Sequence, residues 1–183
     1  MNEITYVGLQ DSIELESWDE EELYAYLEGI SSYIGWIIIY FNSLEGVVSF
    51  AIADLMTHDS FQDERIQVFL AEMQYSQKSR TLINLYGQVI GSYEGYPSQD
   101  QLVEIEKLLF ECGKRRNEYA HADWIGSRES EFVSVKTKAK KKGIFETYKK
   151  FDLEKAKADI EFIYMVRDEI EEFHELFKEQ LYK

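Results

Sequence analysis

The segment DQLVEIEKLLFECGKRRNEYAHADW, residues 100–124, decides the fold class. Its apolar side chains recur three or four residues apart, which is the period of one face of an α-helix. The members of this apolar face are Leu102, Ile105, Leu109 and Cys112. Cys112 is the only cysteine of the chain, so no disulfide can form within it, and its place on this face favours a core role over a nucleophilic one. The segment therefore predicts an amphipathic helix with a cluster of polar residues at its C-terminal end.

Similar patterns on both sides of this segment predict further helices. Apolar residues recur at helical spacing from Leu23 to Leu55, which indicates one long helix or two collinear ones. A second helical region is expected over residues 64–90, with an interruption near residues 73–76. Asp152 can cap a last helix that continues to the end of the chain.

Residues 131–151 follow a different pattern. In the sequence EFVSVKTKAKKKGIFETYKKF, the first part has two alternating sets of side chains, as expected for the two faces of a strand. A lysine-rich turn that ends at Gly143 follows, and β-prone residues come after it. This pattern predicts a β-hairpin. The expected fold is all-α: a single domain over residues 1–183, built as a helical bundle of about four to five helices with a small β-hairpin inserted before the last helix.

The charge of the chain is unevenly distributed. The net charge is −15, yet residues 136–150 hold seven lysines and one glutamate, or +6, which leaves −21 for the remainder. An acidic body repels nucleic acids, so any contact with RNA would need a local basic site. The lysines of the hairpin either contact an RNA backbone, with Phe145, Tyr148 and Phe151 available for stacking, or keep an exposed strand edge soluble. The second explanation is slightly favoured, because alternating lysines are typical of a solvated strand face.

Composition also bears on the compartment and on metal binding. The longest apolar run, Ile34–Phe41, is too short to span a bilayer, and the first residues lack the pattern of a signal peptide. We therefore expect a soluble cytoplasmic protein without membrane contact. The three histidines, His58, His121 and His174, are far apart and have no metal-ligand spacing, so neither a metal site nor a cofactor is expected. His174, beside the apolar face of the last helix, is expected at the surface or its boundary.

The polar cluster RRNEYAHADW, residues 115–124, combines groups suited to phosphate chemistry. A guanidinium such as that of Arg116 binds phosphate oxygens in a fork, and an imidazole such as that of His121 exchanges protons near neutral pH. Asn117 and His121 are neighbours on a helix surface, whereas Arg116 and His121 are about 140° apart around the axis. Arg116 and His121 therefore converge on one ligand only if the helix end bends or the site lies across a cleft. The alternative is structural: arginine and asparagine near a helix C-terminus often bind its last carbonyls or a neighbouring carboxylate.

The sequence RNEYAH, residues 116–121, resembles the R-x4-6-H motif of the HEPN superfamily in the form that has asparagine after arginine. Its position late in a helix, after a long first helix containing FNSLE at residues 41–45, is similar to HEPN domains. Arg115 also has an R-x5-H spacing to His121, but only Arg116 is followed directly by asparagine. Asn42 and Glu45 of the first helix are either partners of Arg116 or simply part of the polar side of that helix.

The resemblance implies a homodimer in which two motifs face one cleft and cleave RNA without a metal. In that case His121 is the general acid or base, Arg116 holds the scissile phosphate, and Asn117 orients the site or binds RNA. The expected products carry a 2′,3′-cyclic phosphate and a 5′-hydroxyl, and the expected role is a toxin or phage-defence effector with an antitoxin or defence-system partner protein. Asp123 stands where HEPN toxins paired with nucleotidyltransferase antitoxins have a tyrosine, which argues against that mode of regulation. Two alternatives remain: a non-catalytic HEPN-like module that dimerises and binds a partner or nucleotide, and an unrelated helical interaction protein.

Overall fold

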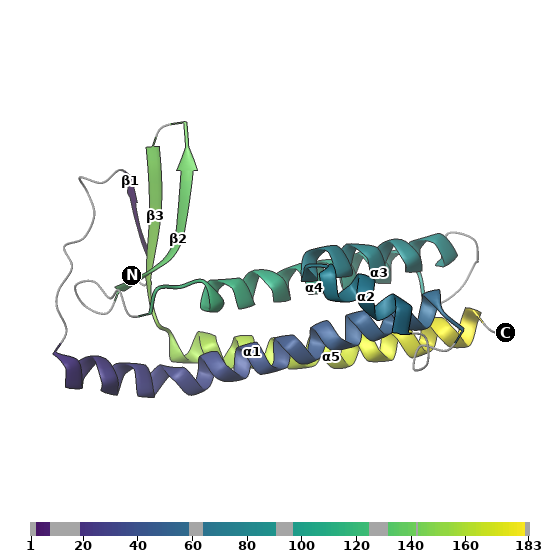
Figure 1. The fold of residues 1–183 in the computed structure, drawn as a ribbon, viewed down its shortest axis with the longest axis horizontal. Coiled ribbons are helices and arrows are strands. Elements are labelled where there is room, and N and C mark those ends of the chain that lie inside the picture. The colour runs from purple at the N-terminus through teal and green to yellow at the C-terminus, as the bar shows by residue number, and fades with distance from the viewer. Residues whose placement is uncertain are drawn as a thin grey trace. The chain divides into compact units, whose positions relative to one another are not determined.

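The computed structural model describes residues 3–7, 19–58, 64–90, 97–124, 132–141 and 143–181. Within these ranges the chain forms five helices and three strands (Figure 1). The helices are α1 (Glu20–Met56), α2 (Glu64–Glu72), α3 (Tyr75–Ile90), α4 (Gln99–Ala120) and α5 (Leu153–Leu181); the strands are β1 (Glu3–Val7), β2 (Phe132–Lys140) and β3 (Gly143–Lys150). The predicted helical fold with a hairpin before the last helix is confirmed.

Side-chain caps explain where two of the helices begin. At the start of α5, Asp152 Oδ1 accepts a hydrogen bond from the N–H of Lys155 at 3.0 Å, which confirms the predicted cap. At the start of α4, Ser98 and Gln101 cap each other: each side chain accepts a hydrogen bond from the other residue's N–H, at 3.3 and 2.8 Å. The predicted interruption of the second helical region lies at residues 73–74, between α2 and α3.

Strand β1 adds to the hairpin, so the sheet has three antiparallel strands in the order β1-β3-β2. The central strand β3 pairs with both neighbours: Thr147 is opposite Thr5 of β1 and opposite Lys136 of β2. Gly143, at the start of β3, has φ +126°, a backbone conformation that glycine adopts without steric cost. The hairpin predicted for residues 131–151 is confirmed, whereas β1 was not predicted.

The chain divides into two compact units, and the first consists of Met1–Ile38 and Arg115–Ile160. This unit holds the sheet, the end of α4 and the start of α5. Its buried apolar residues come from both helices and strands: Ile30, Ile37, Tyr119, Val133, Tyr148 and Ala156. Arg116, Asn117 and His121, the candidate site residues of the RNEYAH motif, all lie in this unit.

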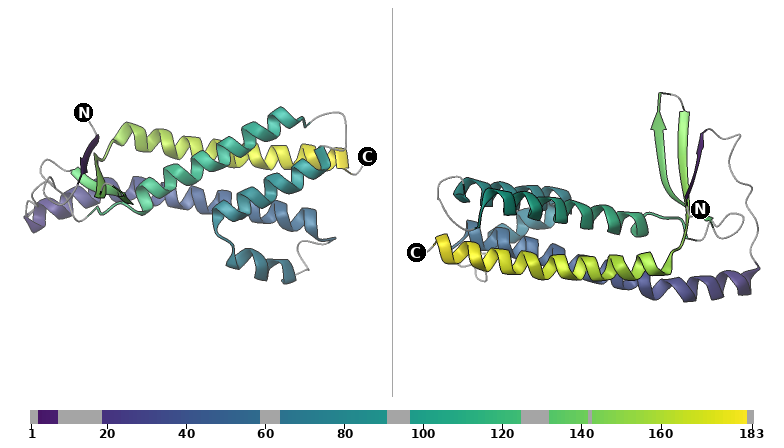
Figure 2. Two further views of the ribbon diagram at one scale, coloured as in Figure 1. Left: turned by 90° about the horizontal axis from the view of Figure 1, so that it is seen from above. Right: turned by 180° about the vertical axis from the view of Figure 1, so that it is seen from behind.

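The second unit consists of Ile39–Lys114 and Glu161–Lys183 and is entirely helical where it is described. Its helices run alongside one another, with the short α2 at their edge (Figure 2). The core includes Phe41, Leu44, Val48, Leu82, Tyr86, Leu109, Ile163, Ile170 and Phe177. Cys112 is fully buried here, as expected of a core residue.

His174 belongs to this second core, which contradicts the expectation that it lies at the surface or its boundary. Its side chain is 3% exposed. Burial is tolerated because both ring nitrogens have partners: Nδ1 is 2.9 Å from the Tyr86 hydroxyl, and Nε2 is 3.1 Å from Asp54 Oδ2. The partners come from α3 and α1, so neither could be identified from the neighbours of His174 in the sequence.

Helix α1 is long and apolar enough to cross a membrane by length and composition alone. An 18-residue window within it has a mean hydropathy of 1.6, and 39% of that window is buried inside the protein. The core helix of a soluble protein and a signal sequence near an N-terminus pass the same test, so one such helix is weak evidence for a membrane span. The buried face of α1 contains Ile37, Phe41, Leu44 and Val48, which is the pattern of a core helix.

Candidate active site

The RNEYAH motif occupies the last turn of α4 and the residue after it. Arg116 and Asn117 lie on the final helical turn, and α4 ends at Ala120. The N–H of His121 donates to the carbonyl oxygen of Asn117 at 3.2 Å, so the backbone keeps a helical hydrogen bond up to the histidine. Asn117 and His121 are exposed, and Arg116 is half-buried. The predicted position of the motif, late in a helix, is thus observed.

The two adjacent arginines have different partners. Arg115 Nη1 donates to Asp159 Oδ1 at 2.9 Å, and the side chain of Asp159 is only 4% exposed. Arg116 Nη1 instead donates to Oδ1 of its neighbour Asn117 at 2.9 Å, on the exposed side of the helix. The buried carboxylate of Asp159 is thus a partner of Arg115.

Asp159 is the centre of a buried polar network below the motif. Its Oδ2 atom accepts hydrogen bonds from the Tyr119 hydroxyl at 2.8 Å and from Lys155 Nζ at 2.7 Å. Burial, together with the hydrogen bond to Asp159, raises the pKa of Tyr119, which keeps its hydroxyl protonated as a donor. Because α4 provides Arg115 and Tyr119 and α5 provides Asp159 and Lys155, the network fixes the end of α4 against the start of α5.

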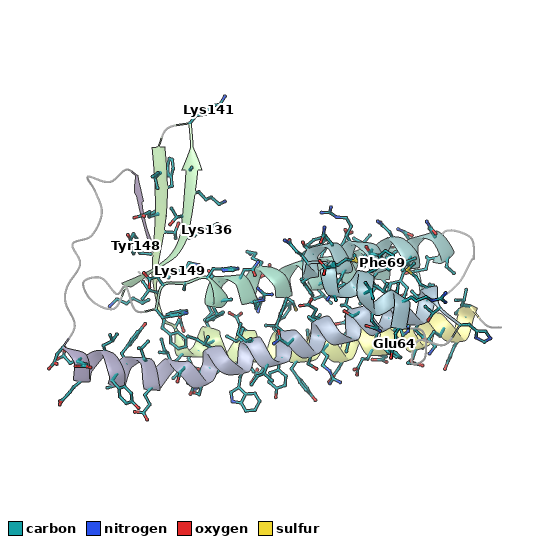
Figure 3. All side chains as sticks on the ribbon, in the orientation of Figure 1. Glu64, Phe69, Lys136, Lys141, Tyr148 and Lys149 are labelled. Carbon is teal, nitrogen blue, oxygen red and sulfur yellow. The ribbon has the colours of Figure 1, made fainter. Side chains whose placement is uncertain are left out.

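Glu118 extends this network to the sheet. Its carboxylate accepts hydrogen bonds from Lys155 at 3.0 Å and from Lys149 of β3, which lies at the base of the hairpin (Figure 3). Burial alone would raise the pKa of Glu118, but the hydrogen bonds and charges of Lys149 and Lys155 lower it below its usual value. The ionised Glu118 therefore links the helix that carries the motif to both α5 and β3.

The chain segment after the motif is held by aromatic packing. Trp124 Nε1 donates to the carbonyl oxygen of Tyr119 at 2.9 Å, and the two rings are stacked with centroids 6.3 Å apart. Phe151 packs edge-on against the Trp124 ring at 5.7 Å. Trp124 therefore anchors the chain directly beyond the helix.

The side chains of Arg116 and Asn117 are hydrogen-bonded to each other, whereas His121 contacts Asn117 through a backbone hydrogen bond. Among the described residues, the His121 imidazole has no hydrogen-bond or ion-pair partner. On a regular helix, Arg116 and His121 are rotated by about 140° from each other. The exposed imidazole can meet a ligand from solvent, and a ligand that bridges His121 and Arg116 must span part of the helix end.

Glu45, considered as a partner of Arg116, has another partner in the second unit. Its Oε1 atom accepts from Lys78 Nζ at 2.7 Å, while Asn42 is exposed. No group of three or more histidine, cysteine, aspartate or glutamate side chains suited to a metal ion occurs in the part of the chain that the structure describes. Arg116, Asn117 and His121 of the motif are the candidate groups for chemistry at this end of α4.

Asp159 was not recognised as a site residue, although the sequence contains a signal for it. Three residues after Ala156 and four before Ile163, it falls on the apolar face of the last helix, where a carboxylate requires a partner. A buried acid on one helix and two arginines on another indicate a pair, but spacing alone does not identify which arginine takes part.

Comparisons of the chain with protein-family models, with curated proteins and with solved structures give no match.

Proposed function

We propose that this protein is a metal-independent endoribonuclease of the HEPN type, with Arg116, Asn117 and His121 as its site residues. The observation that supports the proposal most directly is that the two adjacent arginines have different hydrogen-bond partners. Arg115 binds the buried Asp159, whereas Arg116 donates a hydrogen bond to the exposed Asn117. His121, which follows the last residue of α4, is also exposed. A purely structural explanation applies more directly to Arg115, which binds the buried Asp159 together with Lys155.

The proposed reaction uses the nucleophile that RNA carries. The 2′-hydroxyl loses its proton to a histidine and attacks the adjacent phosphorus, forming a bond from O2′ to phosphorus. The bond from phosphorus to O5′ breaks, and O5′ takes a proton, which leaves a 2′,3′-cyclic phosphate and a 5′-hydroxyl. Arg116 stabilises the charge on the phosphate oxygens with a planar pair of donors, as a metal ion would in other nucleases.

One histidine per chain at the site leads to the proposed homodimer. The reaction needs a base for the 2′-hydroxyl and an acid for the 5′-oxygen, and each motif contains His121 alone. A second copy of the chain would supply the second imidazole and a second Arg116. Asn117 accepts a hydrogen bond from Arg116, so in this mechanism it orients the guanidinium toward the phosphate.

RNA would be the substrate, and the hairpin offers a local basic site in an otherwise acidic protein. Lys136, Lys138 and Lys141 are exposed on β2 and at the tip of the hairpin, where Figure 3 labels two of them. Lys149, by contrast, is engaged with Glu118. The exposed lysines can attract the RNA backbone, while the acidic body limits binding elsewhere. Such an enzyme would act in the cytoplasm as a toxin or phage-defence effector, held inactive by an antitoxin or another partner protein.

The second candidate is a non-catalytic HEPN-like module that dimerises and binds a partner protein or a nucleotide. The net charge of −15 favours this candidate, because an acidic surface opposes binding of a long polyanion. Cleavage of a defined RNA in the absence of metal distinguishes the two. The endoribonuclease yields cyclic phosphate ends and fails on the same RNA with a 2′-deoxy sugar at the cut site, whereas the binding module leaves both RNAs intact.

A further inference from the structure

The second unit contains a cavity of about 620 Å³ between α1 and α5. This volume lies within the range of sites for small organic ligands, roughly 300–1,000 Å³. Gly46, Val47 and Phe50 of α1 form part of its wall, and Glu171, His174 and Glu175 of α5 form another part. The RNEYAH motif belongs to the first unit, so the cavity is a separate candidate site.

The wall contributed by α1 is apolar and partly open. A Cβ atom added to Gly46 would meet nothing within 4 Å, so the missing side chain of this glycine leaves space in the cavity. Phe50, which lines the cavity, is 38% exposed. A ligand with an apolar body would cover the Phe50 ring and occupy the space beside Gly46.

The His174 ring is fixed before any ligand arrives. Its two nitrogens are bound to Tyr86 and Asp54, so neither is available to a ligand, and the buried ring supports the wall of the cavity. Phe50 lies edge-on to this ring, with centroids 6.3 Å apart and an interplanar angle of 80°. Phe50 therefore supplies the exposed aromatic ring of the cavity, and a cation over the face of such a ring is attracted by its negative charge density.

The rim contributed by α5 is negatively charged. Glu171 and Glu175 are four residues apart and so project from the same face of the helix. Their present partners lie on the same helix: Arg167 is 2.8 Å from Glu171, and Lys178 is 3.6 Å from Glu175. Both glutamates are exposed, at 46% and 67%, and exposed pairs of this kind are weak, so a bound cation can compete for them.

We propose that this cavity binds a small amphipathic organic ammonium ion. The ammonium group lies between the carboxylates of Glu171 and Glu175, and the apolar body packs against Val47 and Phe50 in the space beside Gly46. Carboxylates at the rim favour a cation over a neutral or anionic molecule of the same shape, and the Phe50 ring adds to that preference. The net charge of −15 increases the local concentration of such cations around the protein. The proposal does not depend on ribonuclease activity.

Titration calorimetry with the full chain and three probes of one shape tests the proposal: tryptamine as the cation, tryptophol as the neutral analogue and indole-3-propionate as the anion. We expect saturable binding of tryptamine that weakens as salt rises, binding at least tenfold weaker for tryptophol, and none for indole-3-propionate. Equal binding of all three probes, or no saturable binding of tryptamine, would overturn the proposal.

Two sets of variants locate the binding. Gly46→Leu should fill the cavity and abolish tryptamine binding while raising the melting temperature, because leucine is a better helix former than glycine. The double variant Glu171→Gln and Glu175→Gln should weaken tryptamine binding at least tenfold. Glu169→Gln with Glu172→Gln removes the same charge from exposed positions of α5 outside the cavity wall, and should change binding less than threefold. If the two double variants lose affinity equally, or if a folded Gly46→Leu variant binds as well as the parent, the ligand lies elsewhere.

Discussion

At the residue scale, Arg115 and Arg116 are adjacent in the chain but are expected to serve different purposes. Replacing Arg115 by alanine leaves the buried Asp159 with Lys155 and Tyr119 as its remaining partners. We expect a loss of about 1–3 kcal/mol in the free energy of unfolding, because a buried carboxylate loses a charged donor. Replacing Arg116 by alanine should cost less stability than replacing Arg115, because the hydrogen bond of Arg116 to Asn117 lies on the exposed side of the helix.

Urea denaturation of the two alanine variants and the parent measures this difference. Arg116→Lys provides a matched control for chemistry, because it keeps the charge but not the planar pair of donors. That variant should fold normally and fail to cleave RNA. Equal destabilisation by the two alanine substitutions would mean that Arg116 has a structural role comparable to that of Arg115.

His174 leads to a prediction about the pH dependence of stability. Burial is the main reason that its pKa is lowered from 6.5, although Asp54 and Glu175 oppose this shift and Lys178 adds to it. The unfolded chain then takes up a proton near pH 6.5 while the folded protein does not, so stability is full above that pH and falls as the pH decreases below it. The slope from this group can reach about 1.4 kcal/mol per pH unit.

Thermal or urea unfolding of the parent and of His174→Gln between pH 7.5 and 5.5 tests this prediction. The variant, which removes the titrating ring, should lose part of the slope. Asp54 does not produce the same effect in this range: burial raises its pKa, but hydrogen bonds from Lys178 and His174 lower it to below its usual value of 3.8. An unchanged slope in the variant would show that another group controls the acid sensitivity.

At the scale of elements, the hairpin lysines are predicted to attract RNA. Lys136→Glu with Lys138→Glu should weaken binding of a single-stranded RNA oligonucleotide at least tenfold in a His121→Ala background, where the RNA is not cut. Loss of two phosphate contacts should also make the salt dependence of binding shallower, by about 1.4 in the slope of log affinity against log salt.

Lys107→Glu with Lys114→Glu is the matched control, because it changes the net charge equally at exposed positions of α4. Fluorescence anisotropy at several salt concentrations measures both pairs. If both pairs weaken binding equally, the effect comes from net charge; if neither does, the hairpin lysines serve solubility, as edge-strand lysines often do.

Elements with local signals were predicted well from the sequence. The apolar period of α4, the cap at Asp152 and the alternation in residues 131–151 all depend on neighbours a few positions apart. Strand β1 was missed because it is only five residues long and pairs with β3, more than 130 residues away in the chain. Its β-prone residues Ile4, Thr5, Tyr6 and Val7 are a weak signal without knowledge of that partner.

The site was predictable only in part, for a similar reason. The resemblance of RNEYAH to the HEPN motif selected Arg116, Asn117 and His121 as candidates, and the apolar period of the preceding residues predicted their place at the end of a helix. The partners that fix this helix end, Asp159 and Glu118, act through contacts with α5 and β3, which spacing along α4 does not contain. His174 was misplaced because a histidine among glutamates resembles a surface residue, and only its distant partners Tyr86 and Asp54 explain its burial.

At the scale of the whole molecule, we expect a homodimer. The proposed reaction needs both an acid and a base, and the motif of one chain has a single histidine. Light scattering at micromolar concentration should give about twice the chain mass of 21.6 kDa. A monomer at all concentrations in the absence of a partner would exclude a site composed of two copies of the motif.

RNA cleavage by the purified protein in EDTA, compared with cleavage by His121→Ala, tests the proposed function most directly. We predict that the parent cuts RNA at the same rate with or without EDTA, because Arg116 provides the positive charge. His121→Ala should be at least about 100-fold slower, since a general acid or base is removed, while its melting temperature stays close to that of the parent. Cleavage that EDTA abolishes and added Mg²⁺ restores, or cleavage that persists at full rate in His121→Ala, would contradict a metal-independent site built on His121.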